Sequence, residues 1–344
     1  MAYSVKGLPF VYKGAVNVED CGTSEEVMIK SGLNWEVAKC ELIAKMPGLV
    51  EDTTKKEGFL YGGDYFNNCP NAYATYRTDH NIPLGIVKER YTPVQNIEAF
   101  KFFDDAIGKN KAIFQTAGFF GRGERIFVSA KLPKGILVNG EDPVDNYLIF
   151  TTSHDGSSGV KILFSPIRVI CKNTLNAAIR GSSNYVSFRH TTSVHKNIDI
   201  ASEILGICDQ RITYLNEVYA SMYKRRCKDE DAQKLFANVV LTESELDNIE
   251  ATGHNLKEIF TRNWRAMQDA EISTKKVNTL VAMNDYYYLG AGQKEILGTA
   301  WGAYNAVTGY YSNVDNSEGT KRLDTLCFGD KARKIEMAGN FLTL

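Results

Sequence analysis

The spacing of apolar residues changes near Lys196, and this change limits the folds open to the chain. Between Tyr73 and Lys196 the sequence consists of short apolar or alternating runs separated by Gly, Pro, Asn and Asp. This pattern is typical of a meandering antiparallel sheet. After Lys196 apolar residues recur every three or four positions, as they do along helices that bury one face. Strands grouped with packed helices, followed by a mostly helical part, predict an α+β fold.

Three regions follow from this pattern. The length of 344 residues is enough for two domains, or for one large domain with an extension. We expect a mixed N-terminal segment over residues 1–72, a basic antiparallel-sheet α+β domain over 73–196, and a mostly helical C-terminal region over 197–344. The strands predicted in the second region are 73–78, 84–88, 112–120, 125–131, 147–153 and 160–165.

Local signals predict further elements. Thr23 or Ser24 precedes an acidic first turn and Gly32 follows it, which predicts a capped helix between them. Residues 35–43 alternate as a half-buried strand does, whereas the Gly, Asn and charge content of 55–71 predicts a loop or linker. Helices are predicted over 96–107, 243–268, 300–310 and 331–342, and a shorter one beginning at Asn173 or Thr174.

A regular apolar spacing marks the start of the helical region. Over residues 201–222 the apolar positions are separated by four and three residues in alternation, the a/d pattern of a helix that packs along another helix. A helix of the protein's own core is the first interpretation. A seam for an oligomer or another partner is the alternative, and its residues would be Leu205, Ile212, Leu215, Tyr219 and Met222.

The composition is that of an ordinary globular protein and argues against several classes. Lys and Arg number 40 against 41 Asp and Glu, so the net charge of −1 gives no general attraction to nucleic acid or membranes. Seven scattered cysteines without a CxxC pair indicate reduced thiols rather than a disulfide framework or a zinc site. The N-terminus is too polar for a signal peptide, and no stretch of about 18 apolar residues is present. We therefore expect a cytoplasmic protein without membrane contact.

No motif of an enzyme class is present. The sequence has neither a phosphate-binding loop nor a dinucleotide fingerprint, and Gly121–Arg125 reads as a hairpin turn. His190 and His195 lie five apart, which does not match a helical metal pair. The segment His154–Gly159 contains His, Asp and Ser, but adjacent residues do not form a triad, and its composition is that of a hairpin loop. We expect no cofactor and no metal. An enzyme whose active site has no recognisable sequence motif is the least supported possibility.

The charge is unevenly distributed along the chain. Residues 73–196 hold 16 Lys and Arg against 10 Asp and Glu, a surplus of +6, whereas the flanks hold 24 against 31. Aromatic residues such as Tyr76, Tyr91 and Phe127 are interleaved with these cations, as in grooves that neutralise phosphates and stack bases. A half-exposed sheet face of ordinary composition is the alternative. The candidate nucleic-acid-binding residues are Arg77, Lys88, Arg90, Arg122, Arg125, Arg168, Lys172 and Arg189.

Several short segments of the sequence resemble motifs of a known family. They are the segments YRTD (Tyr76–Asp79), YTPVQN (Tyr91–Asn96), SHDGS (Ser153–Ser157), RVICKNTLN (Arg168–Asn176) and TAWGAYNAV (Thr299–Val307). In this order, over roughly residues 20–340, the chain resembles the phage/plasmid-like family defined by a domain of unknown function. The resemblance implies a gene carried by a phage or a plasmid. Such genomes commonly encode single-strand annealing recombinases that combine a curved antiparallel sheet with a basic groove and need no ATP.

These observations lead to two hypotheses. The first is an ATP-independent, homo-oligomeric protein of the annealing type that binds single-stranded DNA in the host cytoplasm. Arg168 and Lys172 beside a helix start would suit a phosphate; alternatively, Asn173 is a plain N-cap and Arg168 pairs with a carboxylate such as Asp79 or Asp155. The second is a phage-encoded inhibitor that wraps or blocks a host defence protein, with the acidic flanks and the 201–222 seam as contacts.

Overall fold

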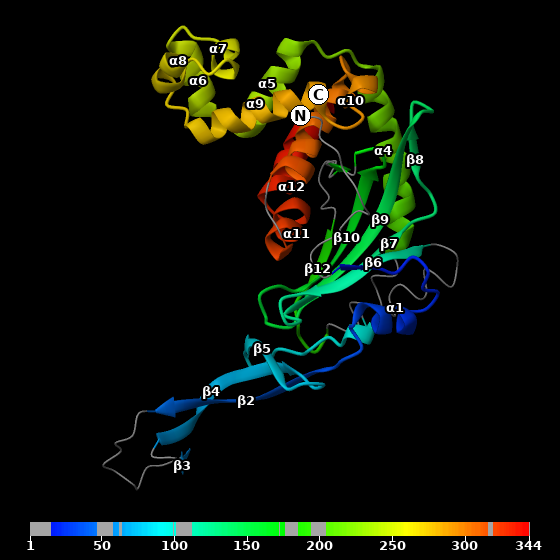
Figure 1. The fold of residues 1–344 in the computed structure, drawn as a ribbon, viewed down its shortest axis with the longest axis vertical. Coiled ribbons are helices and arrows are strands. Elements are labelled where there is room, and N and C mark those ends of the chain that lie inside the picture. Colours follow the sequence, from blue (N-terminus) through cyan, green and yellow to red (C-terminus); the bar gives the residue numbers. More distant parts are fainter. Residues whose placement is uncertain are drawn as a thin grey trace.

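The computed structural model describes residues 15–46, 58–61, 64–98, 100, 112–171, 173–175, 185–193, 204–315 and 319–343. Two antiparallel sheets are followed by a helical C-terminal region, as Figure 1 shows, and the predicted α+β fold is confirmed. The larger sheet forms the centre of the molecule. The smaller sheet projects from one end of it, and most of the helices gather at the other end (Figure 1).

Eight strands form the large sheet among the described residues. Its order is β1-β6-β7-β9-β10-β11, with β8 paired to β9 and β12 paired to β10, and every pairing is antiparallel. The strands are β1 (Ala15–Asn17), β6 (Ile113–Phe120), β7 (Arg125–Lys131), β8 (Ile136–Val138), β9 (Asp142–Ser153), β10 (Val160–Arg168), β11 (Asn173–Thr174) and β12 (Tyr185–Phe188). The predicted hairpin turns at 121–124 and 154–159 connect β6 to β7 and β9 to β10.

Both faces of the large sheet are buried, which explains its nearly continuous apolar strands. Successive residues of a strand point to opposite faces. Accordingly, Ile126 and Val128 belong to one apolar cluster and Phe127 to a second, and Phe150 and Ile149 divide in the same way. The first cluster includes side chains of α4 (Ile204–Lys224), and the second includes side chains of α11 (Gly319–Cys327). Figure 1 shows these helices on the two sides of the strands.

The small sheet forms an arm. Its strands are β2 (Val37–Met46), β3 (Gly58–Tyr61), β4 (Asp64–Arg77) and β5 (Ile82–Val87), in the order β2-β4-β3 with β5 also on β4. The prediction of a loop over 55–71 was therefore wrong for the described part of that segment. Its Gly and Asn content is that of a loop, but Phe66–Asn68 pair with Ile43–Lys45 of β2, and this partner decides the conformation. The expected boundary between residues 72 and 73 falls inside β4.

Several helices end where the sequence indicated. Thr23 caps α1 (Ser24–Ser31) at its N-terminus, and Gly32 ends the helix with φ of 68°. The remaining helices are α5 (Asp229–Val240), α6 (Glu243–Ala251), α7 (Leu256–Phe260), α8 (Trp264–Asp269), α9 (Thr274–Leu289), α10 (Ala300–Gly309) and α12 (Asp330–Thr343), with a 3-10 turn at Lys294–Ile296 and a π-helical turn at Tyr310–Val314. Of the helix predicted over 96–107, residues 96–98 and 100 are helical, and residues 99 and 101–107 lie outside the described residues.

Two predicted helices are corrected. The segment 243–268 contains three short helices. The first ends before Gly253, which has φ of 74°; Asn255 then caps α7, and Asn263 caps α8. At Asn173 and Thr174 no helix begins. These two residues form β11 and pair with Arg168 and Ile167 at the end of β10, so pairing with a neighbouring strand overrides the local cap signal.

Candidate functional site

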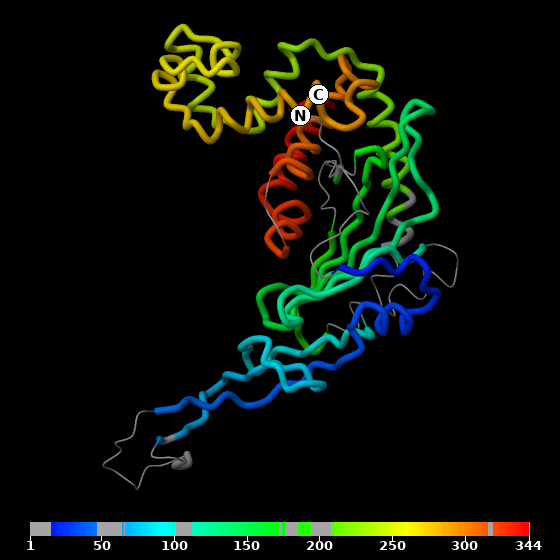
Figure 2. Tube along the Cα trace, in the orientation of Figure 1, coloured from blue at the N-terminus to red at the C-terminus, as the bar shows by residue number. Residues whose placement is uncertain are grey.

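A surface cavity of about 540 Å³ lies where the arm meets the large sheet. Three segments far apart in the sequence line most of it: the end of β5 and the residues after it, within Ile86–Tyr91; the β9–β10 turn, within Gly156–Gly159; and Arg189–Thr191 after β12. Along the trace in Figure 2, the cyan β5 segment approaches the green strands at this junction. Two of the segments that carry the family resemblance contribute to the cavity, YTPVQN with Tyr91 and SHDGS with Gly156.

Close backbone packing holds the first two segments together. A Cβ on Gly85 would lie 2.5 Å from the Cα of Asp155, so only glycine lets β5 approach the β9–β10 turn this closely. The hydroxyl of Thr75 in β4 donates to the carbonyl oxygen of His154 at 2.6 Å. From β2, the ammonium group of Lys39 donates to the carbonyl oxygen of Glu89 at 2.7 Å and steadies the segment after β5.

Tyr91 and His190 form one wall of the cavity. Their rings stack with centroids 4.6 Å apart. The Tyr91 hydroxyl donates to the carbonyl oxygen of Ser153 at 2.7 Å, while His190 contacts the carbonyl oxygen of Thr92 through Nδ1 at 3.3 Å and the Thr152 hydroxyl through Nε2 at 3.1 Å. Burial raises the pKa of Tyr91 and lowers the pKa of His190. Both rings are therefore neutral at pH 7, and the wall carries no charge.

Three cations surround this neutral wall. Lys88, Arg90 and Arg189 line the cavity and are exposed. Among the described residues none of the three has a carboxylate within 4.0 Å. The nearby Asp155 accepts a hydrogen bond from the backbone N–H of Ser157 at 2.9 Å. Clustered cations without carboxylate partners attract anions, and arginine forks match phosphate oxygens in geometry. The cavity is suited to bind phosphate groups.

The other predicted cations lie elsewhere and have partners. Arg77 pairs with Asp79 at 2.6 Å, and its guanidinium lies 4.4 Å from the ring centroid of Trp35. Arg122 pairs with Glu124 at 2.9 Å in the β6–β7 turn. Neither residue lines the cavity. The first pair lies at the end of β4 in the small sheet and the second in the large sheet, and in each the carboxylate neutralises the guanidinium.

Arg125 and Arg168 are buried. Arg125 pairs with Asp324 of α11 at 2.5 Å, and Arg168, with 1% of its side chain exposed, pairs with Asp142 at 2.7 Å and donates to the carbonyl oxygen of Gly292 at 2.8 Å. The prediction that Arg168 binds phosphate at a helix start is corrected, since no helix starts there and the guanidinium is enclosed. Pairing with a carboxylate was the alternative, but its partner is Asp142 rather than Asp79 or Asp155. Lys172 lies outside the described residues.

The predicted seam on α4 is part of the protein's core. The exposed fractions of Ile212, Leu215, Tyr219 and Met222 are 3%, 2%, 0% and 1%, and all four belong to the main apolar cluster. For Leu205 the structure places the backbone in α4. The regular spacing therefore reflects packing within one chain, the first of the two interpretations, and these four side chains are enclosed too fully to form an exposed seam.

Two residues of the cavity were missing from the predicted site. Tyr91 and His190 each follow directly on a predicted cation, Arg90 and Arg189. Their position next to these cations was the feature of the sequence that could have indicated them as site residues. Their stacking could not be predicted, because 98 residues separate His190 from Thr92, the carbonyl that orients its ring.

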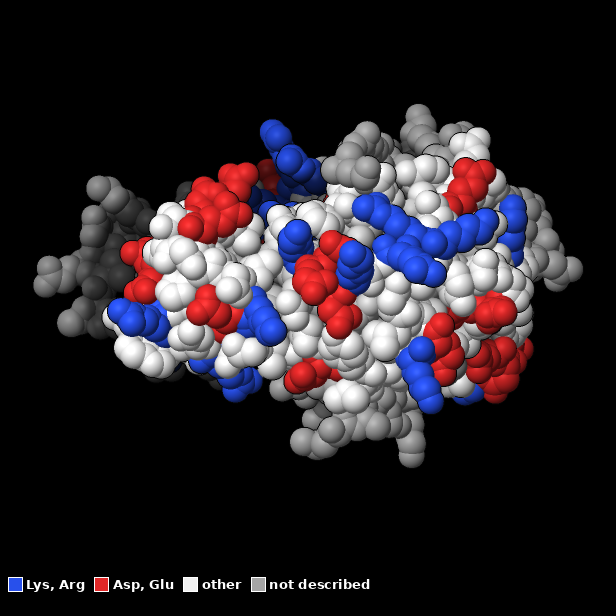
Figure 3. All heavy atoms as spheres, turned by 90° about the horizontal axis from the view of Figure 1, so that it is seen from above, with Lys and Arg blue, Asp and Glu red and all other residues white. Residues whose placement is uncertain are grey.

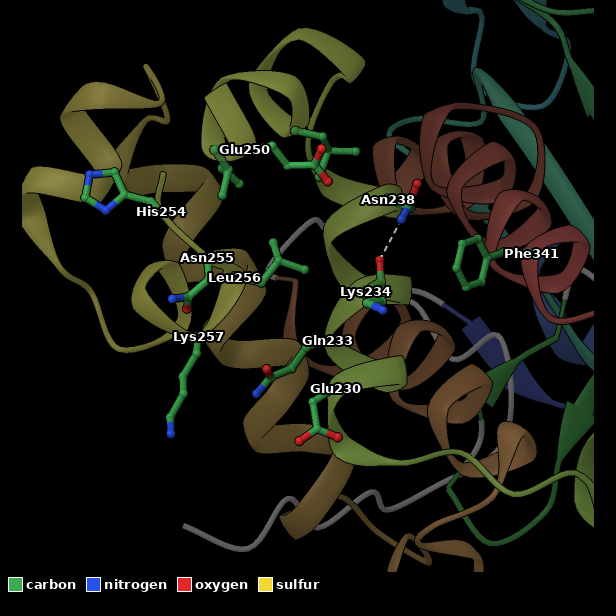
Figure 4. Close-up of a pocket in the computed structure, with 12 residues that line it drawn as sticks. Glu230, Gln233, Lys234, Asn238, Glu250, His254, Asn255, Leu256, Lys257 and Phe341 are labelled. Atoms are coloured by element: carbon green, nitrogen blue, oxygen red, sulfur yellow. Dashed lines mark hydrogen bonds between the residues drawn. The ribbon is translucent and has the colours of Figure 1, made fainter. Parts of the chain in front are cut away.

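A second cavity of about 720 Å³ lies in the helical region between α5 and the short helices α6 and α7. Figure 4 shows Phe341 of α12 on the side opposite His254, and within α5 the Asn238 amide donates to the carbonyl oxygen of Lys234 at 2.8 Å. Its charges balance, with two glutamates and two lysines around an apolar floor. The charged and apolar lining residues are Glu230, Lys234, Glu250, Lys257, Leu246, Ile249, Leu256 and Phe341.

Two further features are absent from the described part of the chain. No group of three or more His, Cys, Asp or Glu residues there could hold a metal ion. None of the described helices combines the length and apolar character needed to cross a lipid bilayer.

Comparisons with known proteins place the chain in a family without a known activity. No curated protein and no solved structure matches it. The profile of a domain of unknown function, DUF932, matches residues 83–338, which include nearly all of the large sheet and of the helical region. Since this match spans well over half of the sequence, the protein belongs to the DUF932 family.

Proposed function

We propose that this protein is a phage- or plasmid-encoded, ATP-independent protein of the annealing type that binds single-stranded DNA in the host cytoplasm. The cavity with Lys88, Arg90 and Arg189 carries the proposal, because it gathers three cations that have no carboxylate partner among the described residues. The resemblance to the phage/plasmid-like family supports the genetic origin.

The lining of the cavity favours a single strand over a duplex. Besides its cations, the cavity is bordered by Ile86, with 65% of its surface exposed, and by the ring of Tyr91. A single strand presents both phosphates and unpaired bases, so cations and flat or apolar side chains can act together on it. In a duplex the bases are stacked inside, so only the phosphates could contact the cavity.

The test measures binding of a fluorescent single-stranded oligonucleotide across a salt series. Replacing Lys88, Arg90 and Arg189 by glutamine should weaken binding and lower the slope of log affinity against log salt by about 0.7 per lost phosphate contact, or about 2 in all. The control replaces Arg265, Lys275 and Lys321 by glutamine; these cations are also exposed and lie on α8, α9 and α11. No detectable binding by the wild type at low salt would refute the proposal.

Annealing and assembly are tested separately. We expect the protein to accelerate pairing of two complementary labelled strands without ATP, and the cavity variant to lose this acceleration. Sizing the protein with and without single-stranded DNA tests the expected homo-oligomer. An unchanged pairing rate in the presence of bound protein would leave DNA binding but refute annealing.

A second candidate function is binding of a host protein, as an inhibitor of a defence system. The cavity of about 720 Å³ between α5 and α7 favours it, because an apolar floor with charges of both signs at its rim suits a peptide segment. The α4 side chains considered earlier for this role are buried. Copurification from host lysate separates the candidates: a stoichiometric protein retained after nuclease treatment favours the inhibitor, and a nuclease-sensitive complex favours DNA binding.

A further inference from the structure

A second group of cations lies at the other end of the molecule. Lys224 ends α4, and Arg225, Arg226 and Lys228 follow it, so four of five consecutive residues are basic and all four are exposed. Figure 3 looks down on the helical end of the molecule and shows Lys and Arg gathered in a band over the part where α4 and α10 lie in Figure 1. This group is hard to recognise from the sequence, because the helical region over 197–344 is acidic as a whole.

The backbone after α4 is fixed in an extended conformation by its neighbours. Arg226 forms a β-bridge with Thr299, and the N–H of Cys227 donates to the carbonyl oxygen of Gly298 at 2.9 Å. Cys227 itself is 5% exposed. Since side chains alternate along extended backbone, Arg226 and Lys228 point to the side opposite Cys227, which is the solvent side.

Three of the four cations have no carboxylate within 4.0 Å among the described residues: Lys224, Arg226 and Lys228. Arg225 differs, because its guanidinium donates to the carbonyl oxygen of Leu342 at 2.7 Å. Three exposed cations that form no ion pair can each accept an anionic ligand such as a phosphate group.

The acidic residues that follow are engaged in other contacts. Asp231 accepts a hydrogen bond from the backbone N–H of Lys228 at 3.3 Å, at the start of α5. Burial and the hydrogen bond to Asp229 raise the pKa of Tyr288 to about 12, so this carboxylate accepts from a phenol that stays protonated. Glu230 lines the neighbouring cavity. None of these carboxylates lies within 4.0 Å of the charged nitrogens of the three cations.

We propose that Lys224, Arg226 and Lys228 form a second contact surface for the phosphate backbone of single-stranded nucleic acid. The inference rests on the proposed function, which assigns the first contact to the cavity at the base of the arm. The two surfaces lie at opposite ends of the large sheet (Figure 1). A short oligonucleotide can therefore occupy only one of them, whereas a long strand can contact both.

The test compares a short and a long single-stranded oligonucleotide in salt series. The variant Lys224→Gln, Arg226→Gln, Lys228→Gln should bind the short oligonucleotide as the wild type does, through the cavity. Its affinity for the long one should fall, and the salt slope should decrease by about 2, since each lost phosphate contact contributes about 0.7. The variant of Arg265, Lys275 and Lys321 controls for the loss of three charges.

The outcomes separate this inference from the proposed function. If the triple variant binds the long oligonucleotide with the affinity and salt slope of the control variant, while the cavity variant is weakened, the second surface is refuted and the cavity stands. If the wild type binds neither oligonucleotide at low salt, the proposed function and this inference both fail. Circular dichroism of each variant confirms that a loss of binding is not a loss of folding.

Discussion

Replacing Asp142 by alanine tests the buried ion pair that joins the large sheet to the helical region. The carboxylate of Asp142, at the start of β9, accepts from Nε of Arg168 at 3.0 and 2.7 Å. The same carboxylate accepts from the indole N–H of Trp301 in α10 at 2.7 Å. The side chains of Arg168 and Asp142 are 1% and 5% exposed. One buried carboxylate therefore accepts hydrogen bonds from both a guanidinium and an indole.

The expected cost follows from this enclosure. Removing one partner of a buried ion pair leaves an uncompensated charge and costs about 3–5 kcal/mol, whereas an exposed pair contributes about 0–1 kcal/mol. Asp142→Ala should therefore lower the free energy of unfolding by about 3–5 kcal/mol. Asp20→Ala, which removes the exposed pair of Asp20 with Lys30, is the matched control and should leave the free energy of unfolding nearly unchanged.

A double variant separates the buried charge from the packing. In Asp142→Leu, Arg168→Met no buried charge remains, and the loss should shrink to about 1–3 kcal/mol, the cost of the unpaired Trp301 N–H. Urea unfolding followed by circular dichroism measures all four proteins. Two results would refute the reasoning: a loss below about 1 kcal/mol in Asp142→Ala, or a double variant less stable than Asp142→Ala.

Two further predictions concern the junction of the arm and the large sheet. Gly85→Ala places a methyl group against the backbone of Asp155 and should cost about 1–3 kcal/mol by overpacking, whereas Gly22→Ala, whose nearest contact is a flexible carboxylate at 3.8 Å, should be nearly neutral; equal urea midpoints would contradict this. Burial lowers the pKa of His154 to about 3, below the 6.5 of an unfolded histidine, so the unfolded chain binds the extra proton. The contribution of His154 to the free energy of unfolding should be complete above pH 6.5 and fall by up to about 1.4 kcal/mol per pH unit below it, and His154→Gln should make the pH dependence between pH 5 and 6.5 shallower by that contribution.

The strands of the large sheet were predictable because local pattern and final environment agree. Around Ile126, Phe127 and Val128 the apolar run is continuous, and both faces of the sheet are indeed buried. The described part of 55–71 was not predictable, because its Asn and Gly residues adopt strands only through pairing with β2. Asn173 is a residue type that commonly caps helices, but pairing with the neighbouring strand β10 determines its conformation.

The candidate site was predictable only as a list of cations. In the sequence, the cavity cations Lys88, Arg90 and Arg189 cannot be told from Arg125 and Arg168, because all five are basic residues of the same strand-rich region. What distinguishes the two groups is the presence of a partner, and those partners are remote. Asp324 lies 199 residues from Arg125, and Asp142 lies 26 residues from Arg168. Charge and aromatic content can select the region, but only the fold shows which charges are already neutralised.

The family match begins at Pro83, inside β5, and this position matters for anyone who expresses the family region alone. A gene fragment cut at that limit encodes β5 without β4, the strand to which residues 82–87 pair. Leu84 and Val87, now 4% and 6% exposed, would lose part of their cover, and the hydrogen bond from Thr75 to the β9–β10 turn would be absent. A fragment that keeps the cation-lined cavity should therefore begin before Val37, with the whole arm included.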